Sequence, residues 1–178
     1  MYLCSARGGQ TPLREKVGMH RLYENEDITV FWDSDRCFHA RMCVSGCPGV
    51  FSFARKPWVD LSKAENPKIW KTVKTCPSGA LDVVYNHGVR IVFDEEKHCA
   101  KAFNGDTVVG RCDYEDDGES FTIIHTEVDE EYTGRGIARR LVFKVAENAE
   151  RRKRKPVPVC SYAVKVLGEA ENKGVRPR

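Results

Sequence analysis

The stretch CFHARMCVSGC (residues 37–47), joined at a distance by CPSGAL (residues 76–81), decides how this chain is organised. Together the two segments supply three clustered thiols and one remote thiol that precedes a proline: Cys37, Cys43, Cys47 and Cys76. An iron–sulfur cluster needs such a set, because a near loop wraps one side of it and a distant cysteine closes the other. The sequence therefore predicts an iron–sulfur site.

Structural zinc is the alternative for these thiols, since zinc also takes four thiolates. Zinc knuckles usually pair cysteines that are two residues apart, and the segment from Cys37 to Cys47 contains no such pair. The spacing therefore favours the cluster.

Length and composition restrict the remaining possibilities. The chain has 178 residues and eight cysteines, with no apolar run of membrane-spanning length and no signal-peptide pattern at its start. We expect a cytoplasmic protein that uses its thiols for metal binding or reactivity, without a membrane association. The net charge of +3 is too small to indicate nucleic acid. Residues 86–150 are acidic and residues 151–178 are basic, which suggests an anionic ligand or partner near the C-terminus.

The segments around the cysteines predict a compact unit. Residues 28–32 are β-branched and aromatic and read as a strand, residues 68–75 as a short helix that delivers Cys76, and residues 81–85 as a second strand. Such a unit has a small core, and a cluster would stabilise it.

This unit, residues 22–85, resembles the small divergent monocluster ferredoxins. The resemblance rests on the segments CFH (37–39), RKPW (55–58) and CPSGAL (76–81). It implies that Cys37, Cys43 and Cys76 are cluster ligands. Three outcomes stay open for the fourth position: a 4Fe–4S cluster with Cys47, which we favour, a 4Fe–4S cluster with His39 or water, and a 3Fe–4S cluster.

The second half predicts an antiparallel meander followed by a helix. Strands are expected over 89–94, 99–103, 107–114 and 119–128, with Asn104-Gly105 as a hairpin turn. A one-faced helix follows over 137–152, because apolar residues recur there with a period near 3.6. A last strand over 157–162 and a weak helix over 163–171 complete the pattern.

The glycine turn before the long helix, TGRGIA (133–138), indicates an anion site. Glycines let a pyrophosphate approach the backbone, and the helix N-terminus offers free N–H groups. The order of elements resembles the GNAT acyltransferase superfamily, and HTEV (125–128) and PVCSY (158–162) resemble a minimal GNAT-like subfamily. The resemblance implies that acetyl-CoA or CoA binds at the turn residues Gly134, Arg135, Gly136, Ile137 and Ala138. Thr133 departs from the Arg or Gln of the signature.

Three residues near the turn are candidates for catalysis. His125 and Glu127 alternate to one face of a strand, where they form either a general base or a solvated pair. Cys160 is expected on the last strand as a reactive thiol, with His125 and Glu127 close enough to generate its thiolate. The basic run over 151–155 is either a helix end that suits the dipole, a contact for the 3′-phosphate of CoA, or a nucleic-acid contact.

We therefore expect an α+β protein in three parts: a flexible tail over 1–21, a ferredoxin-like iron–sulfur domain over 22–85 and a GNAT-like α/β acyl-CoA domain over 86–178. Two functions fit this arrangement. The first is an N-acetyltransferase whose cluster senses redox state or stabilises the fold. The second is an electron-transfer or binding protein that exchanges electrons with a redox partner and docks CoA or a partner without catalysis. The acyl acceptor, a small molecule or an amine, is not specified by the sequence.

Overall fold

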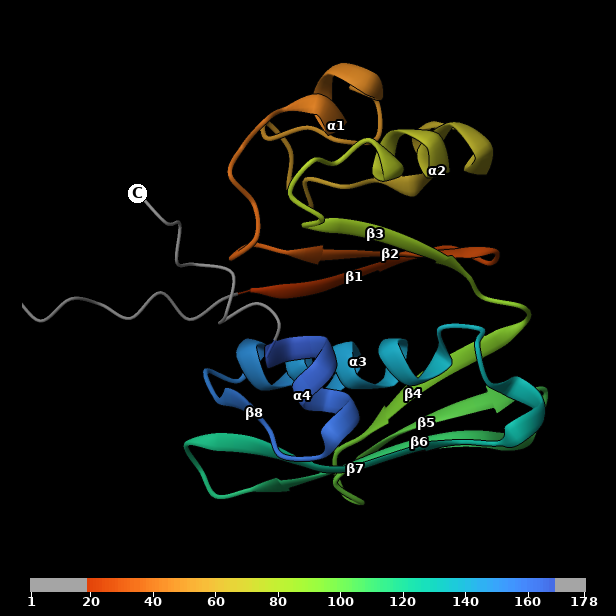
Figure 1. Ribbon diagram of the computed structural model, residues 1–178, viewed down its shortest axis with the longest axis vertical. Helices are drawn as coiled ribbons and strands as arrows, with labels where there is room; N and C mark the ends of the chain where they lie inside the picture. The colour runs from red at the N-terminus through yellow and green to blue at the C-terminus, as the bar shows by residue number, and fades with distance from the viewer. Residues whose placement is uncertain (1–18, 169–178) are drawn as a thin grey trace, which may run out of the picture.

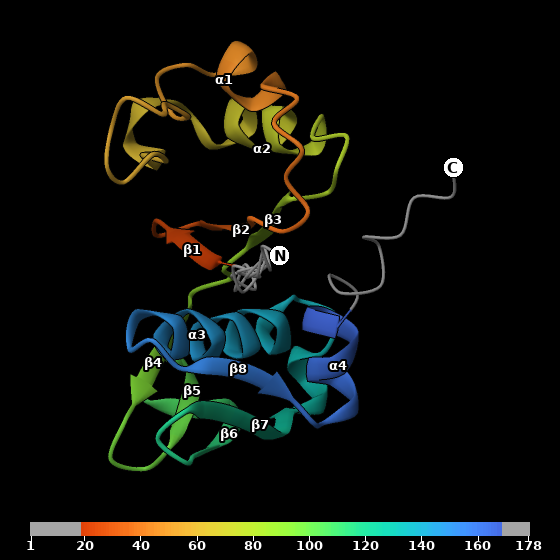
Figure 2. The same cartoon turned by 90° about the vertical axis from the view of Figure 1, so that its left-hand side faces the viewer.

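The computed structural model describes residues 19–168 and contains two sheets with a long helix between them (Figures 1 and 2). The first sheet is antiparallel, in the order β1 (His20–Glu24), β2 (Ile28–Asp33) and β3 (Leu81–Tyr85). The helices α1 (Met42–Gly46) and α2 (Asn66–Lys74) lie on its outer side, with the short 3₁₀ helix η1 (Leu61–Lys63) before α2.

The second sheet has the order β4 (Val89–Asp94), β5 (Cys99–Asn104), β6 (Thr107–Asp116), β7 (Ser120–Val128) and β8 (Lys155–Pro158). All neighbouring strands are antiparallel except β7 and β8, which are parallel. The chain passes from β7 through η2 (Glu130–Tyr132) and α3 (Ile137–Arg151) to β8, and α4 (Ser161–Leu167) packs beside α3. Helices combined with largely antiparallel sheets confirm the predicted α+β class.

Strand β2 is buried on both faces, which explains how the two halves share a core. Ile28 and Val30 face the core beneath α2, whereas Phe31 points the other way, into the core around α3. The ring centroids of Phe31 and Phe143 are 4.9 Å apart in an edge-to-face contact. Because strand side chains alternate between faces, one short strand contributes to both cores.

Helix α3 differs from the prediction of a one-faced helix. Its predicted apolar face packs on the second sheet, but Arg140, Phe143 and Glu147 on its other side are buried as well. The first sheet covers that side, and the buried guanidinium of Arg140 donates to Glu24 at 3.1 Å. The prediction was wrong because it assumed that polar residues on a helix mark solvent.

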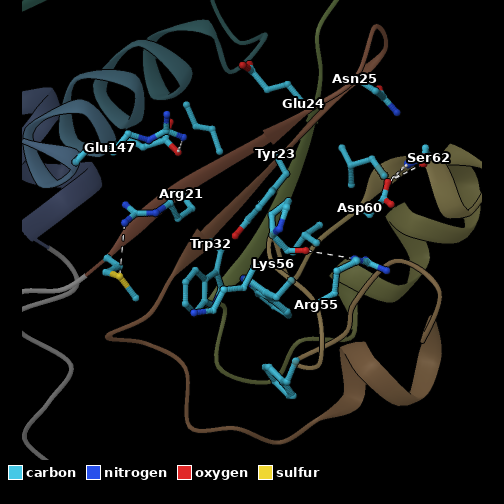
Figure 3. Close-up of a pocket in the computed structure, with 18 of the residues that line it drawn as sticks. Arg21, Tyr23, Glu24, Asn25, Trp32, Arg55, Lys56, Asp60, Ser62 and Glu147 are labelled. Atoms are coloured by element: carbon cyan, nitrogen blue, oxygen red, sulfur yellow. Dashed lines mark hydrogen bonds and ion pairs between the residues drawn. The ribbon is translucent and has the colours of Figure 1, made fainter.

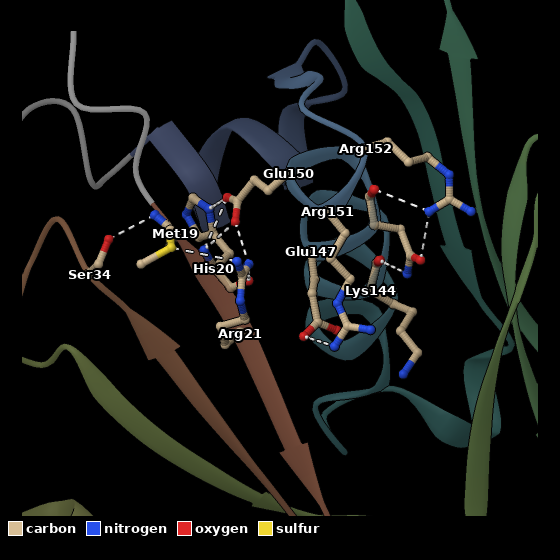
Figure 4. Close-up of polar contacts among 10 residues, drawn as sticks. Met19, His20, Arg21, Ser34, Lys144, Glu147, Glu150, Arg151 and Arg152 are labelled. Carbon is tan, nitrogen blue, oxygen red and sulfur yellow. Dashed lines mark hydrogen bonds and ion pairs between the residues drawn. The ribbon is translucent and has the colours of Figure 1, made fainter. Parts of the chain in front are cut away.

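Polar contacts fasten β1 to the end of α3 (Figure 4). The Glu150 carboxylate, only 4% exposed, accepts from the His20 backbone N–H at 2.9 Å and from the Arg21 guanidinium at 2.7 Å. His20 and Arg21 therefore belong to a strand, and the tail expected over 1–21 extends too far. Residues 1–18 of that expectation lie outside the described part of the chain.

The junction between the sheets is tight. The Asn86 side chain is buried, accepts from the Thr29 hydroxyl at 2.6 Å and donates to the Asn25 carbonyl at 2.8 Å, so it belongs to the first half. The turn itself falls at His87 and Gly88, both in the left-handed region. No helix within residues 19–168 has the length and apolar character needed to cross a membrane.

Candidate functional site

Three of the four predicted cluster cysteines surround one cavity beside the first sheet. Cys37, Cys43 and Cys76 line it, together with aromatic and small apolar residues that include Trp32 and Trp58. Within residues 19–168, no three His, Cys, Asp or Glu side chains converge on a point as ligands of a single metal ion do. The three thiols instead line one small cavity of about 30 Å³, and its largely apolar wall is of the kind that surrounds iron–sulfur clusters.

The backbone after Cys76 supplies hydrogen bonds to its sulfur. Helix α2 ends just before it, Gly79 takes a left-handed φ of 66°, and the Ser78 hydroxyl lies 3.3 Å from the Cys76 sulfur. Burial acts to raise the pKa of the Cys76 thiol, but the Ser78 hydroxyl and nearby backbone amides outweigh it and hold that pKa below its ordinary value. Burial, followed by a smaller contribution from the neighbouring thiols, raises the pKa of Cys43. Cys76 is thus better prepared than Cys43 to act as a thiolate ligand.

Cys47, the favoured fourth ligand, does not line this cavity. Cys47 is 2% exposed and packs in the core beneath α2 with Val50 and Phe51. Its backbone N–H donates to the Cys43 carbonyl at the C-terminal end of α1. His39 does line the cavity, and its Nδ1 lies 3.9 Å from the Cys37 sulfur. The structure therefore brings His39, and not Cys47, to the three thiols.

A larger cavity of about 970 Å³ adjoins the cluster cavity (Figure 3). It lies between β1, the loop 53–62 and the end of α3. It shares His39 and three aromatic residues, Trp32, Phe53 and Trp58, with the cluster cavity. Its wall mixes cations such as Arg21 and Arg55 with carboxylates such as Glu24 and Glu147, so it carries no strong excess of either charge.

In the second half, β7 and β8 separate part-way along their length. Their pairing runs only from Ser120 to Ile123, and the Ile123 carbonyl accepts from the N–H groups of both Val159 and Cys160 at 3.0 Å. The remainder of β7 has no strand on this side. Thr126 lies there, with its hydroxyl 3.5 Å from the Cys160 sulfur and 3.4 Å from the Cys112 sulfur.

Cys160 is not on a strand, contrary to the prediction. β8 is an edge strand with Pro156 and Pro158, and proline cannot donate a ladder hydrogen bond, so pairing stops early. Cys160 then becomes the N-cap of α4, where its sulfur accepts from the Ala163 N–H at 3.3 Å. Its sulfur still lies beside the unpaired part of β7, 3.5 Å from the Thr126 hydroxyl.

His125 and Glu127 are neighbours, as predicted, with 3.3 Å between Nε2 and the carboxylate. They do not approach Cys160. Thr126, between them in sequence, contacts Cys160, so alternation places His125 and Glu127 on the opposite face of the sheet. Their side chains are 58% and 62% exposed there. The expectation that they would generate the Cys160 thiolate is therefore wrong.

The glycine turn opens α3 as predicted, but its two glycines have different surroundings. Both lie in the left-handed region, Gly134 at φ 77° and Gly136 at φ 76°. A Cβ on Gly134 would meet nothing within 4 Å, whereas a Cβ on Gly136 would lie 2.9 Å from Val84 of β3. The close packing of the first sheet therefore explains why position 136 has no side chain, without the expected pyrophosphate.

The other turn residues point away from the first turn of α3 or into the core. The Arg135 guanidinium donates to the Glu131 carbonyl at 2.9 Å and lies over the Tyr132 ring. Ile137 is buried, and Ala138 is half-buried. Helix α3 begins without a side-chain cap and without an acidic residue in its first turn, which leaves its positive end suited to an anion.

The three arginines of the basic run over 151–155 pair with carboxylates. Arg151 pairs with Glu147 at 2.9 Å and Arg152 with Glu95 at 2.6 Å. The run stands at the opposite end of α3 from the glycine turn, about 22 Å away for fifteen residues. The structure favours the plain interpretation of a charged helix end.

Sequence reasoning missed the residues that meet between the halves. Arg139 pairs with Asp82 of β3, and its guanidinium lies 4.5 Å from the centre of the Phe31 ring. Tyr162, at the start of α4, lines a cavity together with Arg139 and Asp82. No local pattern marks Arg139, because its partner Asp82 lies 57 residues away in the sequence.

Comparison with known proteins agrees with this geometry. Residues 23–86 match a family model described as a divergent 4Fe-4S mono-cluster. The chain is 37% identical over 70 residues to the uncharacterized protein YjdI of Escherichia coli strain K12, and this match covers 39% of the chain and 90% of that relative. The protein of the same name from Escherichia coli O157:H7 matches equally.

The chain belongs to the divergent mono-cluster family. Residues 99–173 match a second family model, described as a GCN5-related N-acetyl-transferase, so the mono-cluster domain is fused to a GNAT-like domain. The two matches stand in the predicted order and confirm the predicted fusion. The first half is thus an iron–sulfur domain, and the second half carries an acetyltransferase fold.

Proposed function

We propose that this mono-cluster protein is an acyl-CoA-dependent N-acyltransferase with a bound iron–sulfur cluster. The observation that carries the proposal is the opening between β7 and β8. Beside it, one face of the sheet presents Cys160 and Thr126, and the opposite face presents His125 and Glu127. Such an opening lets an acyl donor and an acceptor approach from opposite faces of one sheet.

The cluster is assigned to Cys37, Cys43 and Cys76, with His39 as the fourth donor. Three observations support this: the three thiols and His39 line one cavity, Cys47 is in the core, and histidine replaces cysteine on iron in some clusters. A cluster bound there would supply one-electron oxidation and reduction and would stabilise the loop over 37–47. We propose a 4Fe–4S cluster.

The acyl donor is assigned to the face of the second sheet that carries α3. The open side of the turn at Gly134 and the uncapped start of α3 favour the pyrophosphate, and the pantetheine arm would reach the opening. Cys160 and Thr126 would contact the acyl end. The half-buried Cys160 thiol is fixed by the Ala163 N–H, which orients it without requiring an acyl-cysteine intermediate.

The acceptor is assigned to the other face, as a primary amine. His125 donates its Nε2 proton to Glu127, which leaves Nδ1 as the acceptor for the amine proton. The amine nitrogen then attacks the thioester carbonyl carbon, the C–N bond forms and the C–S bond breaks. The sulfur leaves with the electron pair as the CoA thiolate, and the amine proton resides on His125.

A second function, CoA binding without catalysis, is favoured by one observation. The side chains of His125 and Glu127 are more than half exposed, whereas catalytic side chains usually lie in a cleft that removes them from solvent. In that case the GNAT-like domain would dock CoA or a partner for an electron-transfer protein.

Acetylation of an amine panel by anaerobically purified holoprotein, followed by mass spectrometry, tests the proposal. His125→Gln and Glu127→Gln are expected to lower kcat/KM by roughly 10²–10⁴. Glu115→Gln is the matched control, an exposed glutamate on the neighbouring strand β6, and it should retain the wild-type rate. CoA binding without turnover would support the second function, and wild-type rates in both variants would place the base elsewhere.

A further inference from the structure

A cavity of about 490 Å³ lies between the two halves of the molecule. Its upper wall comes from the end of α2, the loop after Cys76 and β3, and its lower wall from α3 and α4. It is therefore built from residues that are far apart in sequence. Its size falls within the usual range of small-molecule sites.

The lining of this cavity is strongly basic. It contains four cations, Arg36, Lys74, Arg139 and Lys165. Arg36 already pairs with Asp33 at 3.2 Å, so three cations face the single carboxylate of Asp82. Asp82 is already shared, since Lys74 approaches it to 2.7 Å and Arg139 bonds its other oxygen. The positive charge therefore exceeds the negative charge on the wall, unlike in the 970 Å³ cavity beside the cluster, where carboxylates largely match the cations.

The cavity is next to the proposed acyl-CoA site. Arg139 follows Ala138 directly on the first turn of α3, and Tyr162 lies two residues beyond Cys160. An acyl-CoA bound at the glycine turn and the β7–β8 opening would therefore have its phosphates close to these cations. Arginine and lysine are the side chains that proteins use to bind phosphate.

We propose that this basic cavity binds phosphate groups of the acyl-CoA, so that the mono-cluster domain forms part of the acyl-CoA site. The inference rests on the proposed function and adds a subsite that the acetyltransferase fold alone does not contain. Lys74 comes from the first half and Lys165 from the second. Cys76 lines both this cavity and the cluster cavity, so the loop that holds the cluster also shapes the phosphate site.

Calorimetry with CoA and with pantetheine, which lacks the phosphates, tests the inference on anaerobic holoprotein. The variant Lys74→Ala/Lys165→Ala is compared with Lys71→Ala/Lys155→Ala, which removes the same charge from exposed positions on α2 and β8 outside the cavity. All four lysines are exposed, so both variants should fold and keep the wild-type iron content.

The cavity variant should bind CoA roughly tenfold more weakly than wild type, because two cations near the phosphates are lost. Its affinity for pantetheine should be unchanged, and the control variant should bind both ligands like wild type. Equal CoA affinity in the two double variants would overturn the inference and leave the proposed function intact. A wild-type protein that binds no CoA would overturn both.

Discussion

Replacing Gly136 by alanine tests how closely the two halves pack. The left-handed φ of 76° alone costs a side chain about 1–2 kcal/mol. The added Cβ would also lie 2.9 Å from Cγ1 and 3.2 Å from Cβ of Val84. Valine is stiff at χ1 and cannot swing aside, so overpacking adds about 1–3 kcal/mol. The free energy of unfolding should therefore fall by about 2–5 kcal/mol in total.

Gly134→Ala provides the matched control, because Gly134 has nearly the same φ of 77° and a Cβ added there would have no atom within 4 Å. Gly134→Ala should lower the free energy of unfolding by only about 1–2 kcal/mol, the cost of a side chain in the left-handed region. Val84→Ala combined with Gly136→Ala should recover most of the overpacking term, because it removes the Cγ1 atom at 2.9 Å and leaves only the Cβ at 3.2 Å. Anaerobic urea denaturation followed by circular dichroism measures all three variants. Equal losses for the two glycine variants, or no coupling with Val84, would refute the packing of β3 on α3.

Three further variants or measurements address other parts of the molecule. Glu150→Ala should lower stability by about 3 kcal/mol, because it removes the buried partner of His20 and the Arg21 guanidinium; a loss below about 0.5 kcal/mol in the same denaturation assay would argue against the contact. Alkylation mapped by mass spectrometry should label Cys160 faster than Cys112, since burial raises the pKa of Cys112 to about 12, and CoA should protect Cys160; faster labelling at Cys112 would contradict the structure. Cys47→Ala should keep the wild-type iron and sulfide content, and loss of the cluster in that variant would restore Cys47 as a ligand.

The local sequence pattern predicted most of the helices and strands. The meander from β4 to β7 and the hairpin at Asn104-Gly105 follow from alternation and turn chemistry, which act between near neighbours. The cluster thiols could be found in the same way, because their spacing is itself the signal. The two family matches then follow the order that these patterns indicated.

Contacts between distant segments could not be predicted from one sequence. His20 and Arg21 look like part of a tail until Glu150, about 130 residues later, is placed beside them. Gly136 looks like a phosphate-binding glycine until Val84 occupies the space beside it. Cys47 has the spacing of a ligand, but a side chain can serve the core equally well, and spacing does not distinguish the two roles.

Iron and acid-labile sulfide analysis of anaerobically purified protein, with EPR of the reduced sample, tests the central claim most directly. We predict about four iron and four sulfide per chain in the wild type. Cys37→Ser, Cys43→Ser and Cys76→Ser should each lose the cluster. A colourless protein that holds one zinc ion per chain would contradict the account.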